Sequence, residues 1–131
     1  MVEGVKERVK KEHRSRGLSG RALISARVTQ LYEEGACVYF YYIMDSSGLV
    51  NGSAVFDEIE EIAREEIMAR GGSLSHHHGV GKHRAKLLGD KVLGAGMKRV
   101  LEGLKDSFDP ANVFGIGNGW CRHTDNEDKS A

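Results

Sequence analysis

The 131-residue sequence has few cysteines and a single proline, carries no excess charge of either sign, and contains no long apolar run. Its two cysteines, Cys37 and Cys121, are too few for a disulfide scaffold, and the apolar surroundings of Cys37 predict a buried thiol. No stretch reaches the roughly 18 apolar residues that a membrane span needs. The charged start, MVEGVKERVKKEH, lacks the apolar centre of a signal peptide. These absences favour a reducing, intracellular location.

The charge balance limits the classes of partner. Nineteen basic residues match nineteen acidic ones, so the formal net charge is zero. Non-specific binding to nucleic acid needs a basic surplus that releases counterions, so this class is disfavoured. The composition is that of a globular protein, and the length suits one ordinary domain. Seventeen glycines, clustered around 71–81 and 115–119, indicate backbone that turns sharply or closely approaches another group.

Hydrophobic periodicity predicts four helices. The first spans 2–16 and has a thin valine stripe, and the second spans 54–70 and ends at Gly71. A short helix over 82–88 is expected to stop at Gly89. Asp90 would then cap a last helix that ends before Asp109 and Pro110 and buries an apolar stripe.

Two strands, over 21–32 and 36–44, are predicted to form a hairpin that turns near Glu34. The expected register sets Thr29 opposite Tyr39 and Arg27 opposite Tyr41. Alternation makes one face apolar and gives the other hydroxyls and a guanidinium. Such a polar face usually meets water, and less often it lines a site.

The predicted fold class is α+β, with an antiparallel β-hairpin packed by helices and followed by C-terminal helices. A lone hairpin is marginal in water. We therefore expect the chain to be a piece of a larger domain or to complete its sheet with a second copy, as a homodimer.

The segment GGSLSHHHGVGKHR, residues 71–84, places three consecutive histidines in a glycine-rich loop. Adjacent side chains point in different directions and no acidic residue is near, so no metal site is expected. Two interpretations stay open: a solvated polar loop, or a loop that delivers imidazoles to a site. Imidazole suits acid–base chemistry near neutral pH or binding of an anion, and Lys82 and Arg84 add positive charge.

Three segments together are specific: GACVYFYY at 35–42, AREEIMARGGSLSHHHGVGKHR at 63–84 and LKDSFDPANVFGIGN at 104–118. In this order they resemble the C-terminal part of the alkylglycerone-phosphate synthase family, FAD-linked oxidases of the vanillyl-alcohol oxidase type. The resemblance implies that residues 1–119 are the end of a cap domain plus closing helices. Residues 120–131 are polar and are expected to be a disordered tail.

The resemblance also implies a function. Family members exchange the acyl chain of acyl-dihydroxyacetone phosphate for a long-chain alcohol in ether-lipid synthesis, and a separate N-terminal domain binds FAD. By position, Tyr39 corresponds to the family's proton-transfer tyrosine and His76, His77 and His78 to its histidine triad. Arg27 is expected to bind substrate and Asn118 to approach the flavin. Without the FAD domain, this chain is expected to hold no flavin and to be inactive.

Two other functions also fit the sequence. FAD-dependent 2-hydroxy-acid dehydrogenases carry a similar His-Gly loop, commonly with a glutamate that this loop lacks. A non-catalytic, self-associating module is the third interpretation. The family implies a peroxisomal location in a eukaryote, and a cytoplasmic or membrane-associated one in a prokaryote. Any peripheral membrane contact is expected through regions outside this sequence.

Overall fold

The computed structural model describes residues 1–115. The chain divides into two compact units, Met1–Ser73 and Leu74–Ala131, where its length alone suggested one domain. Asn118 and the predicted tail, 120–131, lie outside the described residues. Helices and an antiparallel two-stranded sheet confirm the predicted α+β class. Within residues 1–115, no helix is both long and apolar enough to cross a membrane.

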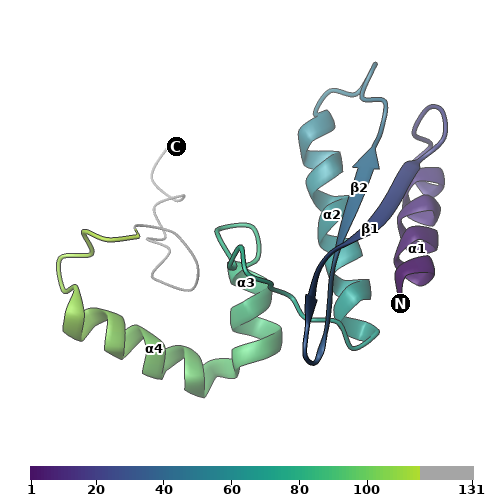
Figure 1. Cartoon of the computed structure of the whole chain (residues 1–131). Coiled ribbons are helices and arrows are strands. Elements are labelled where there is room, and N and C mark those ends of the chain that lie inside the picture. Colours follow the sequence, from purple (N-terminus) through teal and green to yellow (C-terminus); the bar gives the residue numbers. More distant parts are fainter. Residues whose placement is uncertain (116–131) are drawn as a thin grey trace. The chain divides into compact units, whose positions relative to one another are not determined.

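The first unit has the order α1 (Val2–Ser15), β1 (Leu23–Tyr32), β2 (Gly35–Ile43) and α2 (Gly52–Ala69) (Figure 1). The start of α2 is capped by Asn51, whose side-chain oxygen accepts a 3.1 Å hydrogen bond from the Ala54 N–H. Its end matches the prediction. Gly71 adopts a φ of +78°, and the Gly72 N–H donates to the Ile67 carbonyl at 2.9 Å. Helices commonly end in this way, at a glycine that adopts a positive φ because it has no Cβ.

The hairpin register differs from the predicted one. Arg27 lies opposite Tyr39, and Ser25 opposite Tyr41, so the strands are shifted by two residues. An irregularity between Val28 and Gln30 then brings Gln30 opposite Cys37. A shift of two residues keeps every side chain on its predicted face, because the side-chain period of a strand is two. The extra residue of a bulge lets β1 reach the tight turn at 33–34.

The core of the first unit is small. From α1 it takes Val5, Val9 and His13, which are spaced four apart and so lie on one face of the helix. Ile59 of α2 is 0% exposed, and Cys37 of β2 is buried as predicted. Four of these five side chains lie on α1 and α2, the two helices that pack on each other.

The second unit contains α3 (Ala85–Leu87), a π-helical segment η1 (Leu88–Leu93) and α4 (Gly94–Phe108). The predicted stop at Gly89 is wrong, since the helical backbone continues through it as η1, which includes Asp90. The N-cap position of α4 is Leu93, so the predicted cap position at Asp90 is wrong. The break falls instead at Gly94, whose φ of +68° is in the left-handed region.

The apolar stripe of α4 is present but not buried. Met97, Val100 and Leu104 are each at least half exposed, and α4 has no buried residue within the described part of the chain. The expectation that this stripe forms a core is therefore wrong for residues 1–115. Periodicity shows which residues share a helix face, but it does not show what covers that face.

The end of α4 should be sensitive to acid. The Asp109 carboxylate pairs with Lys105 and accepts hydrogen bonds from the Val113 N–H at 2.9 Å and the Phe114 N–H at 3.0 Å. The Lys105 bond first, and then the two backbone N–H groups, lower the pKa of Asp109 from 3.8 to about 2. A lowered folded-state pKa means that these contacts stabilise the charged carboxylate, so their contribution is lost as pH falls below about 4 toward 2.

NMR spectra recorded over a series of pH values should show the amide resonances of Val113 and Phe114 titrating with a midpoint near pH 2. Asp109→Asn removes the charge and should abolish this titration. A midpoint at the ordinary aspartate value of about 4 would contradict the assigned contacts.

Candidate functional site

Tyr39 lies in the middle of β2, on the sheet face opposite the one that packs against α1 and α2. The described burial pattern alternates along β1, where Leu23, Ser25 and Arg27 are exposed and Ile24 and Ala26 are half-buried. Tyr39, Tyr41 and Ile43 lie opposite the exposed set. We call these six residues the open face of the hairpin. The Tyr39 side chain is half-buried on this open face, so it is partly enclosed and partly accessible to solvent.

Arg27 is placed beside Tyr39 by the register. The two residues are direct cross-strand partners, a relation that brings their Cβ atoms to within about 5 Å. The guanidinium of Arg27 lies over the ring of Tyr41, 5.3 Å from its centroid. This geometry is a cation–π contact between diagonal neighbours. The predicted pairing of Arg27 with Tyr41 is thus wrong as a register, but the two side chains do meet.

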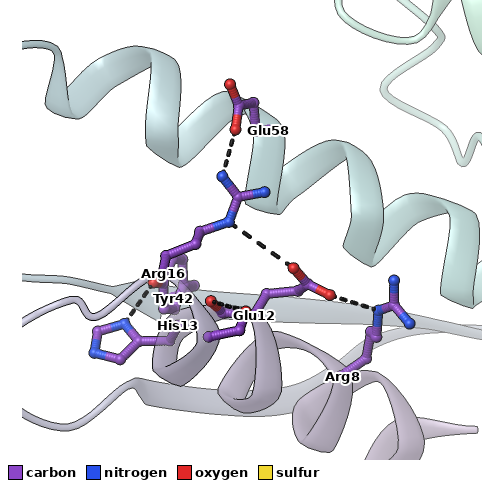
Figure 2. Close-up of polar contacts among 7 residues, drawn as sticks. Arg8, Glu12, His13, Arg16, Tyr42 and Glu58 are labelled. Carbon is purple, nitrogen blue, oxygen red and sulfur yellow. Dashed lines mark hydrogen bonds and ion pairs between the residues drawn. The ribbon is translucent and has the colours of Figure 1, made fainter.

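The opposite face of the hairpin packs against both helices. Tyr42 stacks on Phe56 of α2, with ring centroids 5.5 Å apart, and is joined to His13 of α1 by a 2.9 Å hydrogen bond (Figure 2). Burial raises the pKa of Tyr42, while the nearby Arg16 acts in the opposite direction. Tyr42 therefore stays a neutral phenol and serves to dock the sheet on the helices.

Sequence reasoning missed the role of His13. It is 1% exposed, and its Nε2 has no hydrogen-bond partner among the described residues. The available signal was its spacing, because it continues the Val5–Val9 stripe of α1 by one further turn. His13 is therefore a packing residue of the first unit, distinct from the three histidines of the loop.

A charged network joins α1 to α2 next to this contact. The Glu12 carboxylate lies between two arginines, 3.2 Å from Nε of Arg8 and 3.9 Å from Nε of Arg16. Arg16 also pairs with Glu58 of α2 (Figure 2). These groups are half-buried or exposed, so solvent screens them and the network fixes geometry more than it adds stability.

The histidine loop precedes α3 in the second unit. The Gly79 N–H donates to the His76 carbonyl at 2.9 Å, and Arg84 donates from Nη1 to the Gly79 carbonyl at 3.0 Å. Gly79 and Gly81 both have positive φ, at +78° and +59°. Glycine at these positions allows the chain to fold back on itself, so the loop has a defined turn.

The three imidazoles lie against one another. Ring centroids are 5.1 Å apart for His76 and His77, 4.6 Å for His76 and His78, and 4.4 Å for His77 and His78. Burial, then the charge of Arg84 and the neighbouring imidazoles, lowers the pKa of His76. Neutral imidazole is thereby favoured at His76 near pH 7. A neutral ring can accept a proton or a hydrogen bond, which suits a polar or acid–base site.

The predicted catalytic residues fall in different units. Tyr39 and Arg27 belong to the first unit and the histidine triad to the second, and each group is preassembled within its own unit. Their joining in one site stays a prediction, as do the individual roles of Tyr39, Arg27, the triad and Asn118.

Cofactor and metal binding place different demands on these residues. Among the described residues, no group of three or more His, Cys, Asp or Glu side chains could hold a metal ion. A dinucleotide pyrophosphate usually rests on a glycine-rich turn between a strand and a helix. Here the loop between β2 and α2, residues 44–51, contains a single glycine, Gly48. The described residues therefore do not fit the cradle of the FAD phosphates.

Comparison with known proteins identifies the family of this chain. Residues 1–118 match the family model described as FAD linked oxidases, C-terminal domain. The chain is 45% identical over 118 residues to an alkyldihydroxyacetonephosphate synthase of Caenorhabditis elegans, covering 90% of this chain and 20% of that protein. It is 31% identical over 98 residues to the uncharacterized FAD-linked oxidoreductase YgcU of Escherichia coli (strain K12), covering 72% of this chain and 20% of that protein.

A third relative, the alkyldihydroxyacetonephosphate synthase of Dictyostelium discoideum, is 30% identical over 92 residues, with 70% of this chain and 15% of that protein covered. The chain thus spans a fifth or less of the length of these relatives. Both Tyr39 and the histidine triad lie within the residues matched by the family model.

Proposed function

Because the chain belongs to the family of FAD-linked oxidase C-terminal domains, we propose that it forms the substrate-facing part of an alkyldihydroxyacetonephosphate synthase. The full-length enzyme would exchange the acyl chain of acyl-dihydroxyacetone phosphate for a long-chain alcohol. Two of the relatives reported above, from Caenorhabditis elegans and Dictyostelium discoideum, carry that name, and this supports the choice over 2-hydroxy-acid oxidation.

The observation that carries the proposal is the pairing of Arg27 with Tyr39 on the open face of the hairpin. A phenol that must exchange a proton with substrate needs access, and this one lies on the face opposite the helices α1 and α2 of its own unit. The guanidinium of its cross-strand partner Arg27, which lies over the Tyr41 ring, suits a reaction in which negative charge develops on oxygen. Structural tyrosines are more often enclosed on the packed face, as Tyr42 is.

The residues divide the work of the proposed exchange. The bond from the substrate carbon to the acyl oxygen breaks, and its electron pair leaves with the fatty carboxylate. The alcohol oxygen bonds to the same carbon and gives up its proton, so there is no net oxidation. Tyr39 Oη takes up and returns a proton at the substrate carbon. A flavin, when bound in the full-length enzyme, would supply the ring chemistry that the exchange needs. His76, His77 and His78 stabilise the phenolate or the polar substrate.

The test is an assay of a full-length protein that contains this segment. We expect release of fatty acid and formation of an alkyl ether from acyl-dihydroxyacetone phosphate and a fatty alcohol. A panel of 2-hydroxy acids should reduce the flavin slowly or not at all. Rapid reduction by a 2-hydroxy acid without ether formation would replace this proposal with the dehydrogenase.

We also propose that the protein pairs with a second copy of itself. Within residues 1–115 the sheet has two strands, so β1 and β2 each keep an unpaired edge. Such edges are templates for strand pairing. Sedimentation should show a dimer or a larger assembly at micromolar concentration, and a compact monomer at high concentration would argue against pairing.

A further inference from the structure

The open face of the hairpin changes in character along its length. At one end Arg27 and Tyr39 face each other, then come Ser25 and Tyr41, and at the other end Leu23 pairs with Ile43. Leu23 is 61% exposed, Ile43 63% and Tyr41 43%. A cationic, hydroxyl-bearing end thus passes into an exposed apolar end. Arg27 lies four residue steps along β1 from Leu23, which corresponds to about 13 Å.

This gradient matches a ligand with an anionic head and an aliphatic chain. A guanidinium that lies over an aromatic ring keeps its edge N–H groups available, and those groups suit the two oxygens of a carboxylate. The exposed aliphatic pair and the Tyr41 ring offer apolar surface in line with that head group. A ligand with a neutral or cationic head group would leave the positive charge of Arg27 without an anionic partner.

We propose that the open face binds a long-chain carboxylate, with Tyr41 as the positioning residue that holds the Arg27 guanidinium over its ring. Arg27 contacts the carboxylate, and Leu23 and Ile43 contact the aliphatic chain. This inference rests on the proposed function, in which a fatty carboxylate leaves the substrate carbon where Tyr39 acts. Tyr41 acts through its ring alone, because the ring carries the guanidinium.

The experiment is an NMR titration of the 131-residue chain with decanoate, kept below its micelle concentration. Acetate supplies the head without the chain, and decanol supplies the chain without the charge. We expect decanoate to shift the amides of the open face and to bind at least about threefold more tightly than either control. Shifts confined to other surfaces, or equal affinity for decanol, would overturn the proposal.

Variants then separate the roles. Arg27→Met should weaken decanoate binding by roughly three- to tenfold and leave decanol unaffected. Tyr41→Leu should weaken it about two- to fivefold, the worth of an exposed cation–π contact. Tyr41→Phe keeps the ring and should bind like the unmodified chain. Equal losses for Tyr41→Phe and Tyr41→Leu would show that the hydroxyl matters, and would overturn the positioning role.

Folding is controlled by the thermal midpoint of each variant, since the replaced side chains are exposed and should change stability little. The titration measures no turnover, so its failure is distinguishable from failure of the proposed function. A chain that does not bind decanoate overturns this inference alone, whereas the exchange assay decides the activity.

Discussion

Replacing Tyr39 by Phe in the full-length enzyme should lower turnover by at least about 100-fold while flavin binding stays intact. The substitution removes one oxygen and keeps the ring, so the packing of β2 is preserved. Positioned acid–base groups typically contribute about 100- to 10,000-fold in rate. The expected loss therefore corresponds to at least about 2.7 kcal/mol of transition-state stabilisation. Steady-state turnover and the bound-flavin absorbance of the same preparation measure the two effects.

Tyr41→Phe is the matched control for this experiment. It makes the same chemical change two residues further along β2, on the same face of the sheet. Its ring still carries Arg27, so turnover should fall far less than in Tyr39→Phe. Near-normal turnover of Tyr39→Phe, or a larger loss for Tyr41→Phe, would move the proton-transfer role away from Tyr39.

Replacing Ile59 by Ala should reduce the free energy of unfolding of the first unit by about 2–5 kcal/mol. Ile59 is 0% exposed, at the point where α2 meets the rest of the core. The truncation loses the transfer free energy of the removed carbon atoms and leaves a cavity that rigid neighbours cannot fill. Since small domains are stable by only about 5–15 kcal/mol in total, this one change should cost a large share of the fold.

Urea denaturation followed by circular dichroism measures the effect of Ile59→Ala. Ile43→Ala removes the same atoms from a side chain that is 63% exposed, and should cost roughly 1 kcal/mol or less. Similar losses for the two variants would mean that Ile59 is not the centre of the core.

The local sequence pattern was sufficient to predict most of the helices and strands. The valine stripe, the aromatic strand and the glycine after α2 each act through near neighbours in the chain, so α1, the hairpin and α2 were predictable from sequence. Gly89 shows where such reasoning fails. A glycine weakens a helix by only about 1 kcal/mol, so the surrounding segment could continue through it as η1.

The candidate site also has a part that the sequence predicts and a part that only the structure shows. The resemblance of three short segments singled out Tyr39 and the histidine triad from the sequence. The relation of Arg27 to Tyr39 was not available there, because strand alternation is satisfied equally by registers that differ by two residues. The bulge between Val28 and Gln30 is what selects the observed one.

The sequence by itself determined the α+β class, the faces of each element, and the residues with chemistry to offer. Those features follow from periodicity and from the identity of single side chains. Only the tertiary structure decided that Arg27 pairs with Tyr39 and lies over the ring of Tyr41, that His13 bonds to Tyr42, and that the stripe of α4 is exposed within residues 1–115. Each of these depends on contacts between residues distant in sequence, and such contacts leave no periodic signal in the chain itself.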